Sequence, residues 1–277
     1  MTWCALVALA CAQKREVTAV APEQVIEVVG TEYAFVTPDS VNAGRTVFRL
    51  RNTGKVLHEM IILRLRPGSS VQDLLRAREA GRSTQPFLDG GSAVLFAPPG
   101  ELGDHEITVD LEPGRTYALW CQFSDSAGRP EHYTLGMFKP LHVRNGVAGA
   151  APPDSARVVQ VGATDYAFDV PDTIDAGLVR LALQNRGKQR HELSFGRLTP
   201  AVQGHQVLTD YLAGKPIDYA LGDDGAVLTA PGGDPNPFYI RVRLASGERY
   251  IMLCEFADTT GAPEHVKLGM FKELVVR

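Results

Sequence analysis

Each half of this 277-residue sequence contains a cysteine, a histidine and a methionine within a short stretch. The two sets, both in the order Cys, His, Met, are Cys121, His132, Met137 and Cys254, His265, Met270. A thiolate, an imidazole and a thioether are soft metal ligands of the kind that copper binds. The pattern therefore indicates one metal site in each half, and each site needs a further ligand from another part of the chain.

The two sets belong to an internal repeat, because each member has its counterpart 133 positions later (254 − 121 = 133). Other residues recur at the same offset: Tyr33 and Tyr166, Asn52 and Asn185, His58 and His191, Gly114 and Gly247. A fixed period of this kind indicates a tandem duplication. His58 and His191 are therefore the candidates for the further ligand of each copy.

Strand patterns dominate both copies. Residues 24–30 and 32–36 are rich in β-branched and aromatic side chains, and residues 179–185 alternate apolar and polar side chains with the period of a half-buried strand. The clear helical patterns cover residues 71–81 in one copy and 207–215 in the other. We therefore predict an all-β protein of two tandem antiparallel Greek-key β-sandwich domains, each with a short helical insertion.

The limits of the two domains follow from the repeat. Residues 145–157, between the copies, are rich in small residues, Gly and Pro, which is the composition of a linker. This places domain one at residues 24–144 and domain two at residues 158–277, after a leader and tether at residues 1–23.

The leader predicts an exported protein. Residues 3–12 form a short apolar run that ends in small residues, which resembles a signal peptide in part. Cys11 lies at the end of this run, in a context similar to a bacterial lipobox, and is a candidate for lipidation; a disordered terminus or a short helix is the alternative. No apolar run reaches the ~20 residues of a membrane-spanning helix. We therefore expect a location in the periplasm or on the outer face of a bacterial membrane.

The motifs around the candidate ligands resemble those of the cupredoxins, the fold of the blue copper proteins. In each copy a strand ending in Asn leads through a short turn to a histidine, and a later strand ends in the cysteine, before a histidine and a methionine separated by four residues. The resemblance covers nearly all of the chain after the leader and implies one type 1-like copper ion per domain, held by a trigonal His, His, Cys set with a weak axial Met. The implied ligands are His58, Cys121, His132 and Met137 in domain one, and His191, Cys254, His265 and Met270 in domain two.

The same resemblance implies a carrier rather than an enzyme. It points to an exported copper-binding protein that transfers single electrons or holds copper, with a redox partner protein or a copper donor or acceptor as its partner. One alternative is a metal-free, vestigial pair of sandwiches that serves as a binding or structural module of the envelope. Another is a zinc-binding variant in which a glutamate is a ligand. The net charge of −4 and the lack of a basic stripe exclude a nucleic-acid partner.

One feature departs from the cupredoxin pattern. Residues 122–131 in one copy and 255–264 in the other form a loop between the cysteine and the second histidine that is longer than in typical cupredoxins. Loop-closure entropy grows slowly with length, so the extra residues cost on the order of 1 kcal/mol and do not forbid the site. Polar residues that recur beside the ligands are candidates for orienting the imidazoles: Glu59, Glu131, Glu192, Glu264, Asn52 and Asn185. The histidines without a counterpart are expected on the surface: His105, His142 and His205.

Overall fold

The computed structural model describes residues 23–145, 155–215, 217 and 225–277. The leader, with Cys11, and most of the linker lie outside these residues, so what we predict for them stays a prediction. Among the described residues, no helix is both long and apolar enough to cross a membrane.

The described part of the first copy is built from short strands and one α-helix, as the sequence predicts. In chain order the elements are β1 (Gln24–Gly30), β2 (Phe35–Val36), β3 (Ser40–Val41), β4 (Gly44–Asn52), β5 (His58–Leu65), α1 (Val71–Glu79), β6 (Leu88–Ala97), β7 (Glu106–Leu111), β8 (Thr116–Trp120) and β9 (Phe138–Val143). Helix α1 begins with a capping box, in which the Ser70 hydroxyl accepts from the Asp73 N–H and the Asp73 carboxylate accepts from the Ser70 N–H.

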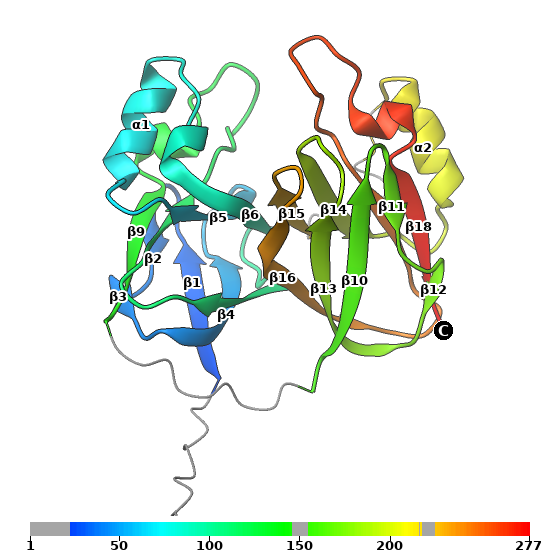
Figure 1. The fold of residues 1–277 in the computed structure, drawn as a ribbon, viewed down its shortest axis with the longest axis horizontal. Coiled ribbons are helices and arrows are strands. Elements are labelled where there is room, and N and C mark those ends of the chain that lie inside the picture. The colour runs from blue at the N-terminus through cyan, green and yellow to red at the C-terminus, as the bar shows by residue number, and fades with distance from the viewer. Residues whose placement is uncertain (1–22, 146–154, 216, 218–224) are drawn as a thin grey trace, which may run out of the picture.

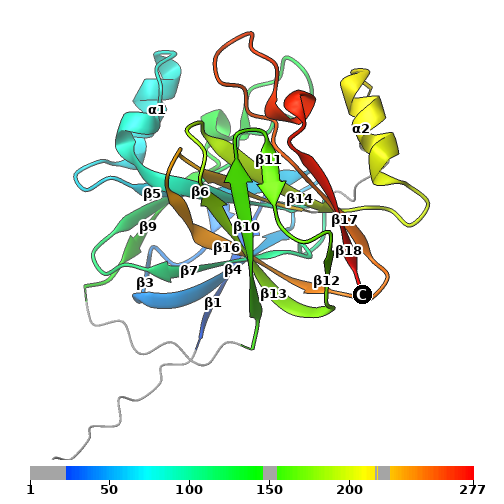
Figure 2. The ribbon, with the colours of Figure 1, turned by 45° about the vertical axis from the view of Figure 1, so that its right-hand side comes forward.

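The second copy repeats this order of elements. They are β10 (Arg157–Thr164), β11 (Ala167–Asp169), β12 (Thr173–Ile174), β13 (Gly177–Asn185), β14 (His191–Arg197), α2 (Gly204–Leu212), β15 (Ala226–Ala230), β16 (Pro235–Leu244), β17 (Arg249–Leu253) and β18 (Phe271–Val276). The all-β fold class with a short helical insertion in each copy is therefore confirmed. The insertions lie on the same outer face of the molecule (Figures 1 and 2).

The strands form two stacked sheets, and each sheet runs through both copies. One sheet has eight strands in the order β11-β10-β13-β16-β7-β4-β1-β2, and the other has ten in the order β12-β18-β17-β14-β15-β6-β5-β8-β9-β3. The copies join where β16 pairs with β7 and where β15 pairs with β6, both antiparallel. This joining leaves neither copy with an open sheet edge at the junction, which removes sites of unwanted strand pairing.

The register at the junction shows that the two copies are related by a local two-fold axis. Val94 pairs with Val227 and Ile107 pairs with Ile240, so at both points a residue lies opposite its own repeat equivalent (227 − 94 = 133; 240 − 107 = 133). A two-fold axis through an antiparallel pair places equivalent residues opposite each other only where the axis passes. The duplicated chain is therefore arranged like a symmetric dimer whose two subunits share both sheets.

Four strand pairs are parallel, so the sheets are mixed and not wholly antiparallel. The parallel pairs are β1 with β4, β3 with β9, β10 with β13 and β12 with β18. Each pair forms because the chain crosses to the other sheet between the two strands and returns in the same direction, which a β-hairpin cannot do.

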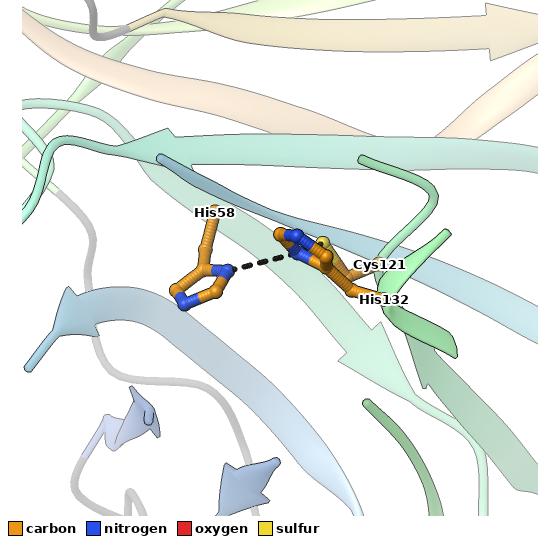
Figure 3. Close-up of side chains that lie close together, drawn as sticks. All are labelled: His58, Cys121 and His132. Atoms are coloured by element: carbon orange, nitrogen blue, oxygen red, sulfur yellow. Dashed lines mark hydrogen bonds between the residues drawn. The ribbon is translucent and has the colours of Figure 1, made fainter. Parts of the chain in front are cut away.

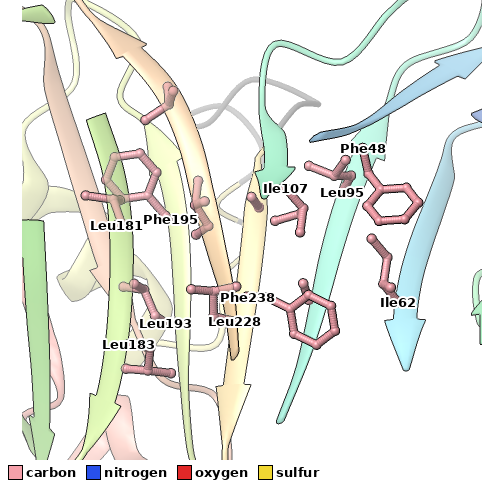
Figure 4. Packing of buried hydrophobic residues seen from close by; sticks show 14 of the residues in the cluster. Phe48, Ile62, Leu95, Ile107, Leu181, Leu183, Leu193, Phe195, Leu228 and Phe238 are labelled. Atoms are coloured by element: carbon pink, nitrogen blue, oxygen red, sulfur yellow. The ribbon is translucent and has the colours of Figure 1, made fainter. Parts of the chain in front are cut away.

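The inner faces of the two sheets enclose one apolar core that is shared by the copies (Figure 4). Phe48 and Leu95 of the first copy and Phe195 and Phe238 of the second belong to this cluster, and all are almost completely buried. Tyr117 of the first copy lies edge-on to Phe238 of the second, with ring centroids 6.4 Å apart. The core therefore holds the two copies together as one body under the metal-site residues.

His105 is buried at the junction, which corrects the expectation that it lies on the surface; His142 and His205 are exposed as expected. It takes the position of Phe238 in the repeat (238 − 105 = 133), and its ring lies against Phe195 of the other copy. Neither ring nitrogen has a hydrogen-bond partner among the described residues. An imidazole that occupies an aromatic core position without partners costs stability.

We expect His105→Phe to stabilise the protein, because phenylalanine matches the repeat equivalent and leaves no buried polar atom unpaired. Burial lowers the pKa of His105 to about 4, so as pH falls below 6.5 the unfolded chain takes up a proton that the folded chain does not, and stability is lost. The gain should be about 1 kcal/mol at pH 8 and roughly 2 kcal/mol larger at pH 4.5. Urea unfolding at both pH values measures it, with His142→Phe as the exposed control; an equal gain at both pH values would contradict the assignment.

Candidate metal centres

Three candidate ligands of the first copy lie at the ends of strands, and the fourth begins a short helix. His58 is the first residue of β5, Cys121 follows β8, His132 begins a 3-10 helix (His132–Leu135), and Met137 immediately precedes β9. Two bonds link these positions: the Cys121 N–H donates to the Met137 carbonyl at 3.1 Å, and the Met137 N–H donates to the His132 carbonyl at 3.0 Å. The three C-terminal positions are therefore fixed to each other by the backbone.

The long loop does not separate His132 from Cys121. The His132 N–H donates to the Phe123 carbonyl at 2.7 Å, and the Tyr133 N–H donates to the Cys121 carbonyl at 2.9 Å. These bonds close the loop at its base, so most of its residues form an excursion beyond the site. The extra length therefore leaves the second histidine beside the cysteine.

Three ligand atoms of the first copy converge in the protein interior (Figure 3). His132 Nδ1 lies 3.2 Å from His58 Nδ1 and 3.4 Å from Cys121 Sγ. All three atoms lie within 4.8 Å of one another, and each of the three residues is at most 1% exposed. An ion at the centre of a triangle of this size would lie on the order of 2 Å from each atom, which is close to the length of metal–imidazole and metal–thiolate bonds.

The second copy reproduces this triangle. His265 Nδ1 lies 3.1 Å from His191 Nδ1 and 3.4 Å from Cys254 Sγ. All three side chains are buried, and the three atoms again lie within 4.8 Å of one another. The donor set and its spacing therefore fit a metal ion in both copies.

Met137 and Met270 are fully buried at the same end of the sandwich. The Met137 methyl group lies 3.3 Å from the point where a Cβ on Gly30 would be, and His58 Cδ2 lies 3.6 Å from the same point. The absence of a side chain at Gly30 thus leaves the space in which the methionine lies beside the His58 ring. Met270 is held by the equivalent backbone bonds to Cys254 and His265.

The protonation states of the metal-free site follow from burial. Burial, with a smaller effect from His132, lowers the pKa of His58 to about 4, so its ring is neutral at pH 7. Burial raises the pKa of Cys121 and of Cys254 to about 12, so both are thiols. Because a metal binds the thiolate, each ion that enters would release a proton, and binding would strengthen with rising pH.

Asp125 and Asp258, which we do not predict from the sequence, orient the second histidine of each copy. His132 Nε2 donates to Asp125 Oδ1 at 3.0 Å, and the Tyr33 hydroxyl donates to Asp125 Oδ2 at 2.8 Å. The second copy has the same chain of contacts, from His265 to Asp258 at 2.9 Å and from Tyr166 to Asp258 at 2.7 Å. A carboxylate at Nε2 fixes the tautomer that turns the Nδ1 lone pair to the centre of the triangle. The long loop therefore supplies the aspartate that holds the histidine.

We expect Asp125→Asn to weaken metal binding at the first site by about 10- to 100-fold, because the neutral amide orients and polarises the imidazole less well. Titration of the variant against a competing chelator should resolve two classes of site, with the unaltered second copy as an internal control. Tyr33→Phe should have a smaller effect in the same direction. A single class of site with the wild-type affinity would contradict the role of Asp125.

Among the described residues, neither Glu59 nor Glu192 forms a hydrogen bond with a histidine ring. Glu59 accepts the Gln122 N–H at 2.7 Å, and Glu192 accepts the Glu255 N–H at 2.7 Å. Both carboxyls therefore anchor the residue that follows the cysteine. Burial raises the pKa of each to about 7.

Glu131 and Glu264 face the helices and not the imidazoles. Glu131 pairs with Arg78 of α1 at 3.0 Å. Glu264 accepts the hydroxyl proton of Tyr211 of α2 at 2.9 Å and pairs with Lys267 at 3.0 Å. These contacts connect the end of each long loop to the helix of its own copy.

Asn52 and Asn185 support the turn before the first histidine of each copy. Asn52 Nδ2 donates to the Val56 and Ala97 carbonyls at 2.7 and 2.9 Å, and its Oδ1 accepts the Gly54 N–H at 2.8 Å. Asn185 makes the equivalent three bonds. The asparagine thus fixes the turn and, through Ala97, the strand that lies opposite His58.

Comparison with known proteins gives structural neighbours only. No protein-family model matches the chain, and no curated protein sequence matches it. Reduced auracyanin from Roseiflexus castenholzii is 19% identical, covers 45% of this chain and 98% of its own, and has a TM-score of 0.31. Auracyanin A from Chloroflexus aurantiacus, a "blue" copper protein, is 21% identical over 44% of this chain and 99% of its own, with a TM-score of 0.29. A multicopper oxidase is 12% identical over 92% of this chain and 88% of its own, with a TM-score of 0.27.

The strand order and the ligand positions of each copy agree with the resemblance of the sequence to the cupredoxins. Each copy has the two-sheet sandwich, with a His at one strand start and a Cys, His and Met around the last hairpin. The protein is therefore a tandem of two cupredoxin-like sandwiches, and each sandwich contains a buried His, His, Cys group that is suited to copper.

Proposed function

We propose that the protein binds one copper ion in each copy and carries single electrons. The observation that supports this most is the duplicated triangle of two Nδ1 atoms and one thiol sulfur, with Met137 or Met270 buried beside it. Copper bound by two imidazoles and a thiolate supplies one-electron chemistry between Cu(I) and Cu(II). His58, Cys121 and His132 would hold one ion, and the equivalent residues of the second copy would hold the other.

Burial of the ligands favours a carrier over a catalyst. His58 and Cys121 are completely buried, and Nε2 of His132 is covered by Asp125. A substrate molecule would have no direct access to an ion at the centre of the triangle, whereas an electron can pass through the protein. Ligands fixed by sheet hydrogen bonds also need little rearrangement when the charge of the ion changes.

Zinc binding and a metal-free role are the alternative functions. No glutamate belongs to either group of converging ligand atoms among the described residues, so a zinc site that includes a glutamate has no support from the geometry. The neutral His58 and the protonated Cys121 and Cys254 place no charge on these ligands in a metal-free fold. Titration with copper therefore tests the metal-free alternative.

We also propose that the protein acts outside the cytoplasm, in the periplasm or on the outer face of a bacterial membrane, with a redox protein as its partner. The apolar run of residues 3–12 supports export. Cys121 and Cys254 are free thiols in the described structure, and a bound metal would protect them in an oxidising compartment.

Titration of the metal-free protein with Cu(II) tests the copper proposal. We expect an intense visible thiolate-to-copper absorption that saturates at one ion per copy, disappears on addition of ascorbate and returns on reoxidation. A protein that stays colourless and binds zinc in preference would support the zinc alternative. A protein that binds neither metal would support the metal-free alternative.

A further inference from the structure

The register of the ten-stranded sheet places the two His, His, Cys groups at opposite ends of the junction between the copies. His58 of β5 lies opposite Ala97 of β6, and His191 of β14 lies opposite Ala230 of β15. Each alanine is three residues along its strand from the pair on the local two-fold axis (97 − 94 = 3; 230 − 227 = 3). Because β6 and β15 are antiparallel, the two alanines lie on opposite sides of that axis, and so do the histidines.

The same register gives the separation of the groups. The strand order β14-β15-β6-β5 puts three strand spacings between the two histidines, and three residues on each side of the axis separate them along the strands. With about 4.8 Å between strands and about 3.3 Å per residue, the Cα atoms of His58 and His191 lie about 25 Å apart. Cys121 follows β8, which lies on the far side of β5 from the junction, so the cysteine is one strand farther from the other copy.

The space between the groups belongs to the shared apolar core. Ala93 and Leu95 of β6 and Ala226 and Leu228 of β15 are part of this core, and each is at most 1% exposed. In the part of the chain that the structure describes, the two His, His, Cys groups are the only clusters of three or more His, Cys or acidic side chains with converging ligand atoms. An electron that passed between the groups would therefore have to tunnel through saturated side chains without an intermediate site, and tunnelling slows steeply with distance.

Each group has a much shorter route to the surface of its own copy. The 3-10 helix His132–Leu135 begins at a histidine that is 1% exposed and ends at a leucine that is 44% exposed. In the second copy, the helix His265–Leu268 likewise runs from a residue that is 1% exposed to one that is 43% exposed. Three residues of a 3-10 helix rise by about 6 Å. The route from each group to solvent is therefore several times shorter than the route to the other group.

We propose that the two His, His, Cys groups are independent one-electron sites, and that each exchanges electrons with its own partner protein at its own end of the junction. This inference rests on the proposed copper binding and adds to it the number of partners, because one chain can serve two partner molecules at once. Each site would take one electron from a reduced partner, which is thereby oxidised, and give one electron to an oxidised partner, which is thereby reduced. No electron needs to cross from one copy to the other.

Pulsed electron–electron double resonance of the protein loaded with Cu(II) measures the separation of the two sites. We expect a single distance of about 25–30 Å, because the sheet register fixes the two groups on either side of the axis. Cys121→Ser and Cys254→Ser are the matched controls, since each should leave a single ion and remove the dipolar signal. A distance below about 15 Å would contradict the separation given by the strand geometry and would overturn the proposal.

Stopped-flow reduction by ascorbate tests whether electrons pass between the copies. The second site should be reduced in the Cys121→Ser variant at its wild-type rate, and the first site should behave in the same way in the Cys254→Ser variant. The redox equilibrium of the remaining site should change by about threefold or less, which is the effect of one unit charge at this distance. A remaining site that is reduced much more slowly than in the wild-type protein would show that electrons enter through the other copy, and would overturn the proposal.

Elemental analysis separates a failure of this inference from a failure of copper binding. A protein that binds no copper would overturn both proposals. Two bound ions at a short distance, or two ions whose reduction is coupled, would overturn only the independence of the sites. Far-UV circular dichroism confirms that each variant folds, and the reciprocal variants test the two copies separately.

Discussion

Replacing Cys121 with serine is expected to halve the thiolate-to-copper absorption of the copper-loaded protein and to leave one ion bound, in the second copy. The thiolate sulfur is the ligand that produces this absorption, and a serine hydroxyl is neither a thiolate nor a soft ligand. Cys121 is fully buried, so no other side chain can move from the surface to replace it. Visible absorption and elemental copper per chain measure the change.

The double variant Cys121→Ser, Cys254→Ser should lose the absorption completely. Met252→Leu is the matched control, because it removes a sulfur atom that is also fully buried but lies outside both ligand sets. If the single variant kept the full absorption, or if the double variant kept any of it, Cys121 and Cys254 would not be the copper ligands.

Substitution of Gly91 by alanine should destabilise the junction between the copies. A Cβ at this position would lie 2.0 Å from the Thr229 carbonyl oxygen and 2.8 Å from Asn236 Nδ2. Asn236 is buried and donates to the Ser92 and Thr229 carbonyls, so the new methyl group would displace backbone and break these bonds. We expect a loss of about 3 kcal/mol and a fall in Tm of about 6–12 °C, measured by thermal unfolding.

Gly162→Ala is the control for this substitution. Its Cβ would approach the flexible guanidinium of Arg186 at 3.1–3.2 Å and the Asp169 Cβ at 3.2 Å, which needs a shift of only a few tenths of an ångström and not the displacement of a carbonyl at 2.0 Å. Its cost should stay below about 1 kcal/mol. Equal costs for the two alanine variants would contradict the tight strand pairing at the junction.

The local sequence predicts much of the fold because strands and helices have local signals. The alternation of residues 179–185 appears as β13, and the helical patterns at residues 71–81 and 207–215 appear as α1 and α2 with ends that differ by a few residues. The cupredoxin-like sandwich in each copy is confirmed. The domain limits at residues 24–144 and 158–277 stay predictions.

The joining of the sheets has no local signal, because it depends on which exposed edges meet. Nothing in the local sequence of strands β6, β7, β15 and β16 marks them as partners across the two copies. Only the register shows that Val94 meets Val227 and Ile107 meets Ile240. A repeat alone does not tell whether its copies pair or stay apart.

Three residues with a functional or structural role have a signal in the repeat. Asp125 and Asp258 are separated by the repeat offset (258 − 125 = 133), and this recurrence inside the long loops was the available signal. His105 stands where the second copy has Phe238, which indicates a core position. A polar residue that replaces an aromatic residue at a repeat position is better predicted as buried than as exposed.

X-ray absorption spectroscopy at the copper edge of the loaded protein tests the central claim most directly. The proposed triangle predicts one sulfur and two imidazole nitrogen neighbours around each copper ion, the same in both copies. Loss of the sulfur signal in the Cys121→Ser, Cys254→Ser variant would assign it to the cysteines. A shell of nitrogen and oxygen neighbours without sulfur in the wild-type protein would contradict copper binding at the His, His, Cys groups.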